Sequence, residues 1–247
     1  VPWRLQGHFA LLFNRGFKRT CRGNCLRGSR ASLHSFNKDL INLKSLNINI
    51  CRSKLKFQQV FSKRNVNSIY FDDLNLSSII ENLDGVMNKK KYRIRWYGDK
   101  KIISNCSLEI KEKKGFVCRK LVKPIKLKNK IFFNYDGIND LKKEILKLID
   151  YKVNLTPVLS THYVREYFLS TLNNQIRATL DYNISSHSII KNQNLIFKKN
   201  FGDYIYEMKY QKKYENLVRN NVLNLANRYS KSSKYVNSAI NKPIYFS

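Results

Sequence analysis

The chain has 247 residues, of which 43% are hydrophobic and 13% aromatic, enough to bury the core of one large domain or two small ones. Lysine and arginine number 47 against 17 acidic residues, and the formal net charge of +30 favours a polyanionic partner such as nucleic acid, an anionic membrane or polyphosphate. The apolar run at 9–13 is too short to span a bilayer, and the five scattered cysteines lack the spacing of a zinc site. We therefore expect a cytoplasmic protein with reduced thiols, the inner face of a membrane being the alternative location.

The first 32 residues differ from the rest in composition, because they hold six arginines and no acidic residue. Such a segment is typical of a disordered basic tail, or of sequence foreign to the adjoining domain, so we expect one domain over 33–247. From Ser35 to about Ser53 apolar residues recur at roughly helical spacing. Ser35 is a suitable N-cap, and the pattern predicts a first helix there.

Four later segments alternate between apolar and charged residues, as half-buried strands do. They are YRIRWYG at 92–98, SLEIKEK at 107–113, IRATLDY at 176–182 and YIYEMKY at 204–210. Their charged faces carry Arg93 and Arg95; Glu109, Lys111 and Lys113; Arg177 and Asp181; and Glu207 and Lys209. A solvated sheet face is the ordinary interpretation of such a pattern. Arginines at i and i+2, and a glutamate two residues before a lysine, favour instead a cationic interior that holds phosphate and a divalent cation.

The remaining segments complete the outline. A strand is predicted at 65–73, a short helix at 75–83 and a long strand at 155–168. Gly98 and Gly115 predict turns. The clearest helical stripe lies at 139–150, where Asn139 or Asp140 is a suitable cap, and a closing helix is predicted at 214–229, followed by SKSSKYVNSAI at 230–240. This order predicts an α+β fold, an antiparallel barrel with helices packed on its outside.

Several single residues allow a structural and a functional interpretation. A lone His162 on a mixed strand is predicted to be structural rather than a catalytic base. Trp96 and the tyrosines of 204–210 are suited to stacking nucleobases, but on an apolar strand face they are predicted to be core. The lysines at 89–91 resemble a polyanion clamp, although a lysine run beside a turn is usually solvated.

A set of motifs resembles the VTC catalytic domain of polyphosphate polymerases, within the triphosphate tunnel superfamily, over roughly residues 60–245. The motifs are SIYFDD at 68–73, RIRWYGD at 93–99, LEIK at 108–111, LTPVLSTHYVREYF at 155–168, IRATLD at 176–181, YEMKY at 206–210 and SKSSKY at 230–235. Each is weak alone, and the ordered set is specific. The resemblance implies an eight-stranded antiparallel tunnel whose basic interior grips a row of phosphates.

The resemblance also implies roles for individual residues. Phosphate ligands would be Arg93, Arg95, Lys111, either Arg119 or Lys120 on the next strand, Arg177, and the pair Lys231 and Lys234 near the tunnel mouth. Arg165 and Lys209 would be further tunnel cations. Glu207 would hold a divalent metal, Mn or Mg, with Glu109 as a second candidate.

The implied activity is transfer of the terminal phosphoryl group of a nucleoside triphosphate such as ATP onto a polyphosphate chain, with a membrane protein as an expected partner. An inorganic triphosphatase and a binding-only sensor of polyphosphate or inositol phosphate share the tunnel and remain alternatives. A nucleic-acid binder is the third, but it predicts cations and aromatics on one face, whereas 92–98 and 204–210 place them on opposite faces.

One element of the family pattern is not recognisable. The family opens with a strand of alternating arginine, glutamate and lysine before its first helix, and nothing upstream of Ser35 shows this alternation. The sequence therefore predicts that the first tunnel strand is missing or replaced by 1–32.

Overall fold

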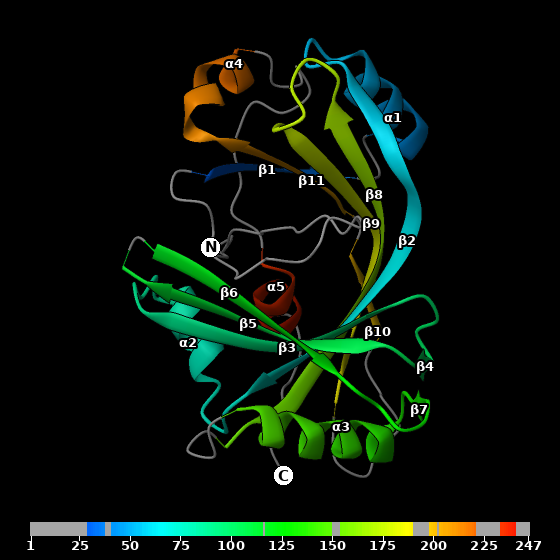
Figure 1. The fold of residues 1–247 in the computed structure, drawn as a ribbon, viewed down its shortest axis with the longest axis vertical. Helices are drawn as coiled ribbons and strands as arrows, with labels where there is room; N and C mark the ends of the chain where they lie inside the picture. Colours follow the sequence, from blue (N-terminus) through cyan, green and yellow to red (C-terminus); the bar gives the residue numbers. More distant parts are fainter. Residues whose placement is uncertain are drawn as a thin grey trace.

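The computed structural model describes residues 29–37, 41–115, 117–149, 154–189, 198–201, 203–220 and 233–240. They form an α+β fold built on one curled antiparallel sheet, with strand order β1-β11-β9-β8-β2-β3-β5-β6 and β10 paired to β9 (Figure 1). The strands are β1 Ser29–Asn37, β2 Phe57–Asp72, β3 Lys89–Tyr97, β5 Cys106–Lys114, β6 Val117–Ile125, β8 Thr156–Ser170, β9 Arg177–Ser188, β10 Lys198–Phe201 and β11 Asp203–Gln211, with β4 Ile102–Ile103 and β7 Ile131–Phe132 forming a separate pair. The helices are α1 Leu43–Arg52, α2 Ser77–Leu83, α3 Tyr135–Leu148, the 3₁₀ turn η1 Lys212–Tyr214, α4 Glu215–Arg219 and α5 Lys234–Ile240.

The sheet curls because its central strands are long and irregular. β2 and β8 run side by side for most of their 16 and 15 residues, and their register shifts near Phe61 and again between Tyr70 and Phe71. Such bulges bend a strand and increase its twist. The eight-strand path therefore forms a half-barrel, and within the described ranges no ladder joins its last strand, β6, to its first, β1.

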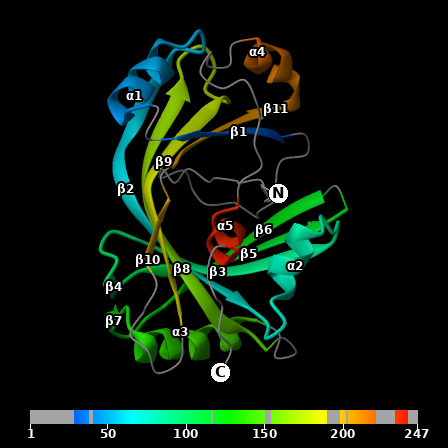
Figure 2. The same ribbon diagram turned by 180° about the vertical axis from the view of Figure 1, so that it is seen from behind.

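Helices cover two parts of the convex face (Figure 2). α1 packs Leu46 and Ile50 against the apolar residues of β8, β9 and β11, and α3 packs Leu141 and Ile145 against those of β3 and β5. The apolar sides of the predicted strands are buried or partly buried in these cores, and Trp96 is fully buried, as predicted. Each large aliphatic or aromatic side chain buried there contributes about 1.5–3 kcal/mol.

α5, unlike α1 and α3, lies on the concave side of the sheet (Figures 1 and 2). Tyr235 donates a hydrogen bond to Asp72 Oδ2 at 2.7 Å and stacks on Tyr70, with ring centroids 4.7 Å apart. The other oxygen of Asp72 accepts from the backbone N–H of Ser78 in α2 at 3.0 Å. One buried carboxylate therefore fixes both helices at the end of β2.

A strand does precede the first helix, where the sequence predicted that the first tunnel strand is missing or replaced by 1–32. β1 pairs with β11 along its whole length, from Ser29 opposite Gln211 to Asn37 opposite Asp203. It extends past residue 32, which was the predicted domain boundary, and residues 1–28 lie outside the described part of the chain. The sequence of the strand lacks the charged alternation of the family pattern. It can still pair with β11, because main-chain hydrogen bonds require no particular side chains.

Two helix starts also differ from prediction. The first helix begins at Leu43, not near Ser35, and Asn42 caps it by accepting from the N–H of Ser45 at 2.8 Å. Asn134 caps α3 in place of Asn139 or Asp140, accepting from the N–H of Gly137 at 2.9 Å. In both cases an asparagine just before the apolar stripe supplies the acceptor that the free N–H groups of the first turn need.

The predicted turns are confirmed, since Gly98 and Gly115 adopt φ values of 94° and 55°. These values lie in the left-handed region, which glycine adopts without strain. Of the predicted segment 214–229, the structure describes the start, which contains α4, and residues 221–232 are not among those described. Among the described helices, none has the length and apolarity needed to cross a membrane.

Candidate functional site

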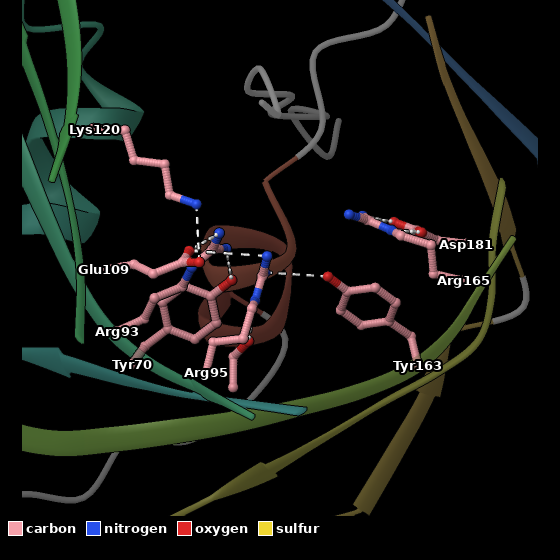
Figure 3. Close-up of polar contacts among 9 residues, drawn as sticks. Tyr70, Arg93, Arg95, Glu109, Lys120, Tyr163, Arg165 and Asp181 are labelled. Carbon is pink, nitrogen blue, oxygen red and sulfur yellow. Dashed lines mark hydrogen bonds and ion pairs between the residues drawn. The ribbon is translucent and has the colours of Figure 1, made fainter. Parts of the chain in front are cut away.

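The concave face of the sheet collects the charged residues of six strands. Side-chain alternation and register place on this face Arg93 and Arg95 of β3, Glu109 and Lys111 of β5, Lys120 of β6, Arg165 of β8, Arg177 and Asp181 of β9, and Glu207 and Lys209 of β11. Figure 3 shows two groups of these side chains facing each other across the concavity, with α5 behind them. The predicted charged faces therefore converge on one space.

Glu109 is the centre of the first group. Its Oε2 accepts from Arg93 Nη2 at 2.6 Å and Nε at 2.8 Å, and its Oε1 pairs with Lys120 Nζ at 2.9 Å. Arg95 Nη1 lies 3.8 Å from Oε2. Burial alone would raise the pKa of Glu109, but Arg93, Arg95 and Lys120 hold this pKa well below its usual range. The carboxylate therefore stays ionised, and it is the counter-ion of three cations in this structure.

Asp181 is the centre of the second group. Arg165 donates two hydrogen bonds to it, one from Nε to Oδ1 and one from Nη2 to Oδ2 at 2.6 Å. Lys234 Nζ lies 2.6 Å from the same Oδ2. All three residues are almost completely buried. Burial would raise the pKa of Asp181, but Arg165 and Lys234 hold it below its ordinary value. Lys234 begins α5, so this pair also fastens the helix to β9.

Tyr163 joins the two groups (Figure 3). Its hydroxyl accepts a hydrogen bond from Arg95 Nη2 at 3.2 Å, and its ring lies 5.1 Å from the Arg165 guanidinium carbon and 4.5 Å from Lys234 Nζ. Cations over an aromatic face are stabilised by the ring quadrupole. Tyr163 was not among the predicted site residues, and its position two residues before Arg165 on one strand is the signal that would have found it.

Glu207 differs from the other two acids. It is 2% exposed, and neither carboxylate oxygen has a hydrogen-bond partner among the described residues. Burial raises the pKa of Glu207 to about 7, although Lys209 and Arg165 oppose this rise. A buried carboxylate with both oxygens open is suited to a hard divalent cation.

The residues present fit a metal at Glu207 better than at Glu109. Both oxygens of Glu109 are already engaged by cations. The described residues contain no cluster of three or more His, Cys, Asp or Glu, so phosphate oxygens and water would complete the coordination at Glu207. Mg²⁺ in phosphoryl-transfer sites is commonly bound in this way, through one or two carboxylates and the substrate.

The other predicted ligands lie at different positions on the sheet. Arg177 and Lys209 are register partners on β9 and β11, and Lys111 is the register partner of Lys120. Arg119 lies opposite Glu112 on the other face of the sheet and is exposed. Of the two alternatives, Lys120 is therefore the residue that faces the concave side. Lys231 lies outside the described residues.

The lysines at 89–91 are not uniformly solvated. Lys90 points away from the concave face and pairs with Glu112 at 3.4 Å, with 54% of its side chain exposed. Lys91 shares the face of Arg93 and Arg95, and its Nζ donates to Ser233 Oγ at 3.2 Å. The interpretation of this run as a solvated surface is therefore wrong for Lys91, because strand alternation turns every second lysine inward.

His162 is structural, as predicted. It lies on the convex side, where Nδ1 is 2.9 Å from Asn67 Oδ1 and Nε2 is 3.2 Å from Ser160 Oγ. Burial, together with His187 and Lys100, lowers the pKa of His162 to about 3. The imidazole is therefore neutral and held by both nitrogens.

His162 is expected to make the fold sensitive to acid. Its pKa is depressed in the folded state, so its stabilising contribution is complete above pH 6.5, the ordinary value, and is lost progressively as the pH falls towards 3. At pH 5 the loss should be about 2 kcal/mol. We expect H162Q, measured by urea denaturation, to gain stability relative to the wild type by about this amount between pH 7.5 and pH 5. A difference that does not change with pH would contradict a buried neutral His162.

Comparison with known proteins assigns the family. A family model described as the VTC domain matches residues 42–240. This match covers most of the chain, which therefore belongs to the VTC domain family, and its curled antiparallel sheet with helices outside agrees with the α+β fold that the motifs predicted. No curated protein sequence matches the chain.

Two solved structures are among those similar to this chain. A proposed adenylate cyclase from Vibrio parahaemolyticus is 9% identical, with a TM-score of 0.42 over 78% of this chain and 81% of that one. A proposed adenylyl cyclase from Hippeastrum, described as having a dominant triphosphatase activity, is 11% identical, with a TM-score of 0.40 over 87% of this chain and 98% of that one.

Proposed function

We propose that this domain transfers the terminal phosphoryl group of a nucleoside triphosphate onto a polyphosphate chain held in the concave face. The observation that carries the proposal is the pair of facing cation groups around Glu109 and Asp181, beside a buried Glu207 with two open oxygens. Membership of the VTC domain family supports it. Cations on two walls suit a linear polyanion better than a flat nucleic-acid surface.

The residues of the chain would act mainly by binding and orientation. Arg93 and Arg95 would bind equatorial phosphate oxygens from one wall, while Arg165 and Lys234 would bind from the other, keeping the attacking and leaving oxygens in line. Each cation would exchange its carboxylate partner for phosphate, because Glu109 and Asp181 already occupy the positions that phosphate oxygens would take. A divalent metal bound at Glu207 would supply further positive charge to the phosphates.

An end-product assay tests this function. Purified protein is incubated with ATP and manganese, and long-chain polyphosphate is separated from free phosphate on a gel. We expect polyphosphate from the wild type and none from E207Q, which keeps the shape of Glu207 and loses the charge that would hold a metal. Free phosphate alone would identify a triphosphatase, and a full-rate E207Q would contradict the metal assignment.

A binding-only sensor is the second candidate, and one observation favours it. The positions of β1 that lie opposite Glu207 and Lys209 are occupied by Leu33 and Ala31, so this strand contributes no charged residue there. The family pattern has charged residues in its first strand, and their loss would remove ligands from one wall. Tight polyphosphate binding without turnover in the same assay would place this candidate first.

A further inference from the structure

A row of three lysines crosses the concave face beside the first cation group. Lys91 of β3 is the register partner of Lys111 of β5, which is the register partner of Lys120 of β6. Adjacent strands are about 4.8 Å apart, so the three residues cover about 10 Å across the sheet. Lys91 also lies two residues from Arg93 on the same face, about 6.6 Å along the strand. The row therefore extends the cationic surface of β3 across the neighbouring strands β5 and β6.

Lys91 has less compensation than Arg93 and Arg165, which pair directly with carboxylates. Its ammonium group donates to a neutral acceptor, the hydroxyl of Ser233 just before α5. The charged groups around it are Lys89 and Arg93 on its own strand, Lys111 on β5 and the carboxylate of Asp72 at the end of β2. Asp72 is itself bound to Tyr235 and to the N–H of Ser78. Positive charge therefore outweighs negative charge at this position.

We propose that Lys91, with Lys111 and Lys120, binds a phosphate group of a polyphosphate chain beyond those held by Arg93 and Arg95. The proposal rests on the proposed function, since it places more of the same ligand on the same face. It names a residue that the motif comparison did not carry over, and it gives the site a preference for chains over short phosphates.

The protonation of Lys91 provides a second measurable effect of chain binding, besides the affinity. Burial, then Lys111 and Lys89, lower the pKa of Lys91 to about 7, so at pH 7 the amine is about half charged. A bound polyanion favours the charged amine and raises this pKa. Chain binding should therefore be accompanied by uptake of about half a proton at Lys91 at pH 7.

Titration calorimetry at pH 7 tests both effects. Pyrophosphate and long-chain polyphosphate are titrated into the wild type, K91M, K91R and K90M, in buffers of different ionisation enthalpy that count protons taken up. K90M is the matched control, because Lys90 is the exposed neighbour on the other face. We expect K91M to weaken polyphosphate binding roughly tenfold or more, pyrophosphate binding much less, and K90M to change neither.

K91R keeps a cation that stays charged, and it separates binding from titration. It should retain polyphosphate binding and lose the proton uptake assigned to Lys91, and circular dichroism shows that each variant is folded. If K91M and K90M bind polyphosphate equally well, or if K91R takes up as many protons as the wild type, the proposal for Lys91 is wrong and the proposed function stands. If the wild type binds no polyphosphate, the proposed function itself fails.

Discussion

Replacing Asp181 with asparagine is expected to lower the free energy of unfolding by about 3–5 kcal/mol. The carboxylate is 2% exposed and pairs with Arg165 and Lys234, which are as deeply buried. Without it, two cations would remain beside each other in a site shielded from water. The expected loss is a large part of the roughly 5–15 kcal/mol that holds a typical domain together.

Urea denaturation of D181N and of a matched control measures this effect. Asp140 pairs with Lys143 on the surface, with side chains 61% and 73% exposed, and D140N should cost at most about 1 kcal/mol. Added polyphosphate should restore part of the stability of D181N, since phosphate can replace the missing carboxylate. Equal unfolding midpoints for D181N and the wild type would show that Asp181 is not the counter-ion of Arg165 and Lys234.

Replacing Arg93 with alanine is expected to reduce the rate of the proposed polymerisation about 100- to 1000-fold, the usual cost of removing one donor to a developing anion. Arg93 presents a planar fork of donors to the concave face, and lysine at this position offers a single charge in its place. We expect R93K to recover only a small part of the rate. Stability should change less than activity, because Glu109 keeps Lys120 at 2.9 Å.

The control for this experiment is R119A. Arg119 is an exposed arginine on the other face of the sheet, so its removal should leave the rate unchanged. Product formation by R93A, R93K and R119A at saturating ATP, together with their melting temperatures, separates loss of function from loss of fold. An R93A protein as active as R119A would contradict the assignment of Arg93 to the phosphate-binding face.

The sequence predicted the faces of the sheet better than its ends. Alternation alone placed Arg93, Arg95 and Glu109 on one side of two strands, because the two-residue period of a strand is local information. β1 was missed because the partner that stabilises it, β11, lies more than 160 residues away along the chain. Short stretches such as Ala31 to Ser35 have no strong period of their own.

The ion pairs also could not be predicted from the sequence. No local sequence pattern indicates that Asp181 pairs with Lys234, which is 53 residues away, or that Glu109 pairs with Arg93 and Lys120. These pairs depend on the order of strands and on the position of α5, both set by tertiary packing. Lys91 could have been assigned to the face of Arg93 and Arg95, because it continues their i, i+2 spacing by one step.

The open side of the half-barrel has a consequence for association between copies of the protein. Among the described residues β6 is the last strand of the path, and an edge strand offers unpaired backbone groups to any neighbouring chain. Its sequence, VCRKLVKPI, contains Pro124, which lacks an N–H, and three basic residues, Arg119, Lys120 and Lys123. Two such edges would bring like charges together and could not complete a hydrogen-bonded ladder, so the composition of β6 protects the protein against edge-to-edge aggregation.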